Sequence, residues 1–268
     1  MNDFAAFLAL ALYLLCSLLL ILRTQDKAPC ASCPMIVLLA PGFVAVAVHA
    51  VVLYNNLITA DGLQFGLSNA ASAIGAVIGL MVLLMSIKRR TILLAVVVLP
   101  IAALSIWLEL QFPVSRLLPP DSPDGLKIHV LVSIVAYSLL GMAALIAIIL
   151  AMQNHLLHNH HSGGVLRHLP PLQTTEKLMF DAITAGFLGL TLALASGFAF
   201  LDNLFTQHLA HKTILSIIAW GVFAILLIGH RLLGWRGRVA IRWTLSGFGF
   251  LMLAYFGSKL VLEVILKQ

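Results

Sequence analysis

Charged residues are scarce in this sequence. Of its 268 residues only 10% are Asp, Glu, Lys or Arg, whereas 61% are apolar and the mean hydropathy is +1.05. Soluble domains carry about 25% charged residues. The shortage of charge excludes a soluble globular domain, a disordered chain and a fibrous repeat, and it indicates a polytopic membrane protein.

Cysteine and the common catalytic motifs are also scarce. The three cysteines cannot form a disulfide framework, and Cys30 and Cys33 are the only close pair. This pair has redox or metal-ligand spacing, but no second pair completes a zinc site. The sequence has no serine elbow, phosphate-binding loop, paired acid and base carboxylates or HExxH motif. We therefore expect no enzyme activity.

Long apolar runs are what the sequence has in abundance. A helix needs about 20 mostly apolar residues to cross a bilayer, and eight runs have this length: roughly 4–22, 35–54, 66–86, 91–110, 128–151, 178–201, 213–230 and 243–264. Turn, breaker and charge signals separate them. We predict an all-α polytopic membrane protein, a single bundle of eight transmembrane helices that forms one integral-membrane domain over residues 1–268.

The basic residues give an orientation. Eleven of the sixteen Lys and Arg residues fall on one side of the predicted spans and five on or toward the other. The positive-inside rule makes the first side cytoplasmic, which places both termini on the outer, periplasmic side. The same rule accounts for the net charge of +6, so we expect membrane lipid, and not nucleic acid, as a partner. The first span is expected to be a retained helix, since no cleavage site follows it.

Three histidines lie within or at the ends of predicted spans: His49, His129 and His230. Ionisable groups in the bilayer are costly, which makes each a functional candidate. A neutral imidazole is a common ligand of metals and haem iron. His49 and His129 are both expected near the outer surface, at a depth compatible with two axial ligands of one haem iron, whereas His230 is expected near the opposite face. Alternatively, each histidine makes a polar contact between helices.

Five further histidines crowd the segment that follows the fifth span, at positions 155, 158, 160, 161 and 168. Such a tract can bind metal. A solvated cytoplasmic loop is the simpler interpretation, and we favour it.

Short motifs follow one another in order along the second half of the chain. They are Ile128-His129-Val130, Ser133-Ile134-Val135-Ala136-Tyr137, Glu176-Lys177-Leu178, Gly229-His230-Arg231 and Ala254-Tyr255-Phe256-Gly257-Ser258. In this order the sequence resembles the cytochrome c assembly protein family, and most of all its short, eight-span, HemX-like branch. The family-like core covers about residues 60–265.

The resemblance implies a membrane haem-binding protein that serves haem handling or cytochrome biogenesis in a bacterial inner membrane. It places His129 on the family's outer-face histidine and His230 on the histidine of the following span. His49 is the candidate for the early-span histidine. The family's tryptophan-rich delivery segment corresponds here to residues 198–205, which contain no tryptophan.

We therefore expect haem b, held by His49 and His129 as axial ligands, with a second role for His230. Trp220 and Phe200 are expected in the apolar wall of the haem site. An apocytochrome, or another membrane or cytoplasmic protein, is the expected partner.

A basic side chain, Arg116 or Lys127, is expected to pair with the haem propionates. The alternative function is a cofactor-free membrane scaffold or regulator, for example of tetrapyrrole synthesis. Such a protein would use its basic cytoplasmic face to bind a partner.

Overall fold

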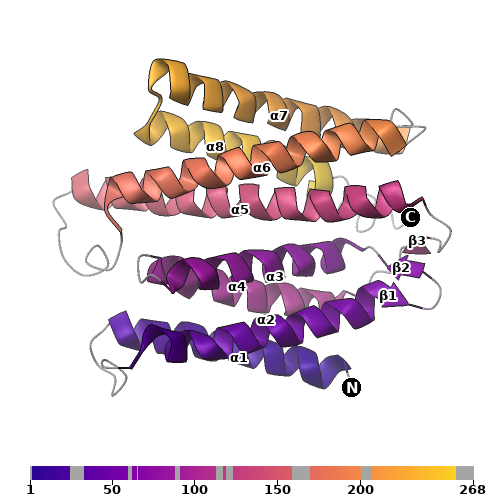
Figure 1. Ribbon diagram of the computed structural model, residues 1–268, viewed down its shortest axis with the longest axis vertical. Helices are drawn as coiled ribbons and strands as arrows, with labels where there is room; N and C mark the ends of the chain where they lie inside the picture. The colour runs from indigo at the N-terminus through magenta and orange to yellow at the C-terminus, as the bar shows by residue number, and fades with distance from the viewer. Residues whose placement is uncertain are drawn as a thin grey trace. The chain divides into compact units, whose positions relative to one another are not determined.

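The computed structural model describes residues 2–24, 33–59, 62–64, 66–87, 91–112, 117–118, 123–158, 170–200 and 207–257. Helices dominate this part of the chain (Figure 1). They are α1 (Asn2–Thr24), α2 (Met35–Leu57), α3 (Leu67–Ser86), α4 (Ile92–Gln111), α5 (Asp124–His158), α6 (Leu172–Phe200), α7 (Gln207–Leu233) and α8 (Gly237–Met252), which continues as a π-helix over Leu253–Gly257.

Contacts divide the chain into two compact units. The first unit comprises residues 1–121 and 162–170, and the second comprises residues 122–161 and 171–268. Helices α1–α4 therefore belong to the first unit and α5–α8 to the second. The single membrane domain over residues 1–268 stays a prediction.

In the first unit, α1 packs against α2 and α4, and α3 packs against α2 and α4. Polar side chains support this packing by reaching backbone oxygens of neighbouring helices. The Cys16 thiol donates to the Leu38 carbonyl at 3.4 Å, and the Ser17 hydroxyl donates to the Val96 carbonyl at 3.0 Å. Interhelical hydrogen bonds of this kind hold helices together where lipid surrounds them.

Three very short strands add a small sheet to the first unit. They are β1 (Ile58–Thr59), β2 (Gly62–Gln64) and β3 (Leu117–Leu118), paired antiparallel in the order β1-β2-β3. Leu63 lies opposite Ile58 on one side and opposite Leu118 on the other. This sheet was not predicted, because segments of two or three residues are too short to show the alternation of a strand.

In the second unit, α5 and α6 lie side by side along most of their length (Figure 1). Gly186 of α6 faces α5 so closely that a Cβ atom there would lie 2.7 Å from Leu140 Cγ. Helix α8 packs against α5 and α7. The Tyr137 hydroxyl of α5 donates to the Leu251 carbonyl of α8 at 3.0 Å.

The membrane assignment is confirmed. Among the described residues, seven helices, α1 to α7, are long and apolar enough to cross a bilayer. Large apolar side chains on them are exposed, for example Phe4, Val51, Leu131 and Leu192. Lipid is the environment that suits such surfaces. The chain is a multi-pass membrane protein in contact with lipid.

The eighth span and the outward termini stay predictions. The expected span began at residue 243, but α8 already begins at Gly237. The sequence predicts that the charged segment Arg236-Gly237-Arg238 separates two spans, and the helix starts inside this segment. Residues 258–264 of the expected span lie outside the described part of the chain.

Packing of α5 on α6 depends on the missing side chain at Gly186. We expect Gly186→Ala to lower the free energy of unfolding by about 1–3 kcal/mol, because the added methyl group overpacks the contact with Leu140. Thermal unfolding of the detergent-purified protein measures this effect. The matched control is Gly221→Ala on α7, where a Cβ would meet nothing within 4 Å. Equal melting temperatures for the two variants would contradict the prediction.

Candidate functional site

His129 lies near the start of α5, half-buried against α6. Its Nδ1 is 3.0 Å from the Ser196 hydroxyl oxygen, and that hydroxyl donates to the Ala193 carbonyl at 3.0 Å. Because the serine proton is used in this way, its oxygen accepts from the Nδ1–H of His129. Nε2 is then the unprotonated nitrogen. An imidazole oriented through Nδ1 with a lone pair on Nε2 is in the state that coordinates a metal.

Space for the His129 ring comes from the next residue of α6. A Cβ at Gly197 would lie 3.2 Å from Cε1 of the His129 ring. Phe200, one turn further along α6, covers Gly125 on α5 and is 49% exposed. Phe200 therefore packs on α5 four residues before His129, and its expected place in the apolar wall of a haem site stays a prediction.

His230 lies in the last turn of α7. Its Nδ1 is 2.9 Å from the Trp235 carbonyl oxygen, which can only accept, so Nδ1 carries the proton and Nε2 the lone pair. The ring stacks on Phe180 of α6 with 3.6 Å between centroids and 16° between planes. A neutral His230 ring therefore has the same tautomer as His129, with its proton on Nδ1.

The two histidines of the second unit lie far apart. His129 contacts α6 at Ser196, whereas His230 contacts α6 at Phe180, sixteen residues earlier. At 1.5 Å per residue this separation is about 24 Å along the helix. His129 and His230 therefore cannot coordinate one iron atom, as their predicted positions at opposite faces require.

His49 differs from both, because each of its ring nitrogens has a partner. In the first unit it is 0% exposed, with Nδ1 3.2 Å from the Tyr13 hydroxyl of α1 and Nε2 2.8 Å from the Ser72 hydroxyl of α3. A neutral imidazole has one donor and one acceptor, and both are used here. The arrangement is that of a polar contact joining α1, α2 and α3.

A ligand role for His49 requires Tyr13 or Ser72 to release the ring. His49 belongs to the first unit and His129 to the second. Their pairing on one iron stays a prediction.

The other residues expected around the haem have partners of their own. Trp220 Nε1 donates to Thr191 Oγ1 at 2.9 Å, and its ring stacks on Phe187. Lys127 makes an exposed ion pair of 3.0 Å with Asp124. Arg116 lies outside the described residues.

The cysteine pair and the histidine tract are described only in part. Cys33 is a free thiol, and Cys30 lies outside the described residues. His155 and His158 end α5, whereas the histidines at 160, 161 and 168 are not described. Within the described part of the chain no three His, Cys, Asp or Glu side chains form a group that could hold a metal ion.

Sequence reasoning missed one buried acid. Glu109 of α4 is 5% exposed, and its Oε1 accepts from Asn56 Nδ2 at 2.9 Å. Its Oε2 is buried and has no hydrogen-bond partner among the described residues. The signal was available, because Glu109 is a carboxylate inside the span expected at 91–110, and acids inside spans are functional candidates.

The contact of His49 with Ser72 should contribute to stability. We expect Ser72→Ala to lower the free energy of unfolding by about 1 kcal/mol, which is within the range of interhelical hydrogen bonds in membranes. The control is Ser138→Ala, since Ser138 is also 0% exposed but donates within its own helix, to the Ile134 carbonyl. Melting temperatures in detergent measure the effect. A larger drop in melting temperature for Ser138→Ala than for Ser72→Ala contradicts the polar-contact interpretation.

Comparison with known proteins gives a consistent assignment. The model of the family described as cytochrome C assembly protein matches residues 37–266, which include all three candidate histidines. The chain is 31% identical over 224 residues to the inner membrane protein YpjD of Escherichia coli K12, covering 83% of this chain and 85% of that protein.

A more distant relative is the cytochrome c biogenesis protein CcsA of Chlamydomonas reinhardtii, 26% identical over 164 residues, or 60% of this chain and 45% of that protein. An uncharacterized 28.8 kDa protein of Azospirillum brasilense is 34% identical over 143 residues, 53% of each chain. No solved structure matches. The family match over most of the chain confirms the resemblance of the sequence motifs: the chain belongs to the cytochrome c assembly protein family.

Proposed function

We propose that this protein binds haem in the membrane and handles it for cytochrome c biogenesis. Membership of the cytochrome c assembly family supports a role in that process. The observation that carries the haem-binding step is the contact of His129 with Ser196, which leaves the lone pair on Nε2. A half-buried histidine that is oriented through its other nitrogen has the properties of an axial ligand.

The residues around His129 suit this role. Ser196 fixes the orientation of the ring, and Gly197 leaves room for it at the contact with α6. Phe200 adds an apolar surface at the same end of the two helices. When bound, the haem would supply an iron centre. The proposed cofactor is haem b, bound without a covalent bond, because no histidine follows the Cys30–Cys33 pair to make an attachment motif.

His230 is proposed as a second, separate ligand. Its Nδ1 is tied to the Trp235 carbonyl and its ring rests on Phe180, so its Nε2 is also available for coordination. His49 is the proposed partner of His129 only if its contacts with Tyr13 and Ser72 open. The contacts of His49 favour a structural role over a ligand role.

The cellular setting follows from the relatives. One relative is named an inner membrane protein, and we assign this chain to a bacterial inner membrane on that basis. An apocytochrome is the proposed recipient of the haem. No catalytic step is assigned to the chain itself.

A visible spectrum tests the proposal directly. The detergent-purified protein, expressed with ample haem, should give a Soret band and sharp α and β bands on reduction with dithionite. His129→Ala should remove or shift the part of these bands that comes from haem at His129, and leave the part that comes from haem at His230. Ser196→Ala should weaken haem retention by about tenfold or more, since loss of an orienting partner typically costs a metal site 10–100-fold in affinity.

Controls separate the ligand role from general damage. Ser138→Ala removes a buried hydroxyl of the same unit that bonds within its own helix, and it should leave the spectrum unchanged. An unchanged spectrum in His49→Ala would show that His49 is not a ligand. A protein that stays colourless after expression with ample haem contradicts the proposed function.

His129 and His230 should behave independently. Because their contacts on α6 lie about 24 Å apart, His230→Ala is expected to leave the bands assigned to His129 in place. The losses of haem per protein in the two single variants should add in the double variant, as effects at distant sites do. Haem quantified as the pyridine complex measures this. If either single variant removed all the haem, two separate sites would be ruled out.

A further inference from the structure

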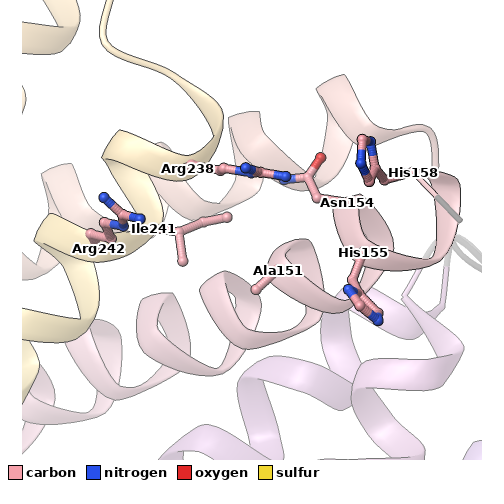
Figure 2. Close-up of a pocket in the computed structure, with 7 residues that line it drawn as sticks. All are labelled: Ala151, Asn154, His155, His158, Arg238, Ile241 and Arg242. Atoms are coloured by element: carbon pink, nitrogen blue, oxygen red, sulfur yellow. The ribbon is translucent and has the colours of Figure 1, made fainter.

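A basic pocket lies between α5 and α8, away from His129 and its partners. It has a volume of about 330 Å³, within the range of about 300–1,000 Å³ of small-molecule sites. Figure 2 shows the side chains that line it. They are Ala151, Asn154, His155 and His158 of α5 and Arg238, Ile241 and Arg242 of α8.

Helical spacing explains why these residues share a pocket. The α5 residues are separated by three, one and three positions, and the α8 residues by three and one. Side chains three and four apart lie on one face of a helix. The pocket is therefore made by one continuous face of each helix, with cationic side chains on α8 and hydrogen-bonding side chains on α5.

The two arginines of the pocket have no acidic partner among the described residues. Asp124, Glu176 and Asp181 are the carboxylates that the structure describes in this unit, and none makes an ion pair with Arg238 or Arg242. Glu176 instead accepts the backbone N–H of Gly237 at 2.6 Å. The pocket thus carries positive charge that no described side chain neutralises.

Two of the side chains approach each other, and Arg242 lies on the far side of Ile241 from them. Figure 2 shows the Arg238 side chain extending from α8 toward Asn154, with His158 beside it. Two guanidinium groups, an amide and imidazole groups give a set of donors. A planar guanidinium binds two oxygens of a phosphate at once. Ala151 and Ile241 give the pocket an apolar part.

The pocket lies at the basic end of the unit. Exposed Arg231 and Arg236 lie at the same turn between α7 and α8, and the positive-inside rule assigns this end to the cytoplasmic side. Basic pockets between helices at this level of a membrane meet the headgroups of anionic lipids. A phosphate with apolar chains attached fits both parts of the pocket.

We propose that this pocket binds a phosphate group, that of an anionic phospholipid in the cytoplasmic leaflet. Arg238 and Arg242 bind the phosphate oxygens, and Asn154 donates from the opposite wall. The glycerol and the first methylenes of the acyl chains contact Ala151 and Ile241. The same donors would also hold a soluble phosphate, and the test distinguishes the two sources.

Native mass spectrometry of the full-length protein in detergent measures binding of dioleoylphosphatidylglycerol. Arg238→Gln/Arg242→Gln should weaken it by about tenfold or more, because charge-assisted hydrogen bonds are the strong ones. Arg231→Gln/Arg236→Gln is the matched control, since it removes the same charge from exposed residues outside the pocket, and it should bind as the unchanged protein does. Dioleoylglycerol, which lacks phosphate, should show no dependence on either pair.

A second variant tests the pocket without changing either arginine, in case the double variant does not fold. Ala151→Leu fills the pocket while every charge stays in place, and it should also weaken binding of the phospholipid. Inorganic phosphate is titrated in parallel: binding of phosphate alone, lost in Arg238→Gln/Arg242→Gln, supports a phosphate site with a soluble ligand. Equal losses of phospholipid binding in the two arginine pairs, or no loss in the pocket pair, overturn the proposal.

Discussion

The close approach of α5 to α6 determines the geometry of the candidate haem ligand. Without a Cβ at Gly186 the two helices come together at Leu140, and eleven residues further along α6 the gap at Gly197 admits the His129 ring. Small residues at helix contacts are the usual means of such packing in membranes. The bond from His129 to Ser196 is therefore a consequence of backbone proximity along the whole pair.

Hydrogen bonds distinguish two histidines, His49 and His129, whose surroundings in the sequence are similar. His49 and His129 both lie in apolar runs and both contact serines. The Ser196 proton is committed to a carbonyl of its own helix, so one nitrogen of His129 is oriented and the other keeps its lone pair. His49 has hydroxyl groups on both sides, from Tyr13 and Ser72, and these use the whole bonding capacity of the ring.

Sequence predicted the helices well because length and apolarity are enough for that purpose. All eight described helices overlap the expected runs, and the start of α8 was missed because Arg236 and Gly237 resemble a loop signal. The contacts of His49 were beyond sequence reasoning, since they depend on the rotation of α1, α2 and α3 about their axes. Helices that are apolar all round carry little periodic signal to fix that rotation. The family motifs placed His129 and His230, but Ser196 and the Trp235 carbonyl became visible as partners only in the structure.

The positions of the carboxylates in the second unit bear on its basic end, because they determine whether Arg238 and Arg242 have partners within the described chain. Among the described residues, Glu176 accepts a hydrogen bond from the Gly237 amide at the start of α8. An acid at a helix N-terminus satisfies an otherwise unpaired N–H and complements the helix dipole. That contact lies one residue before Arg238, at the start of the helix that carries Arg238 and Arg242 beside α5. Neither arginine makes an ion pair with a described carboxylate, and in a membrane the phosphates of the lipid headgroups are abundant anions that can neutralise their charge.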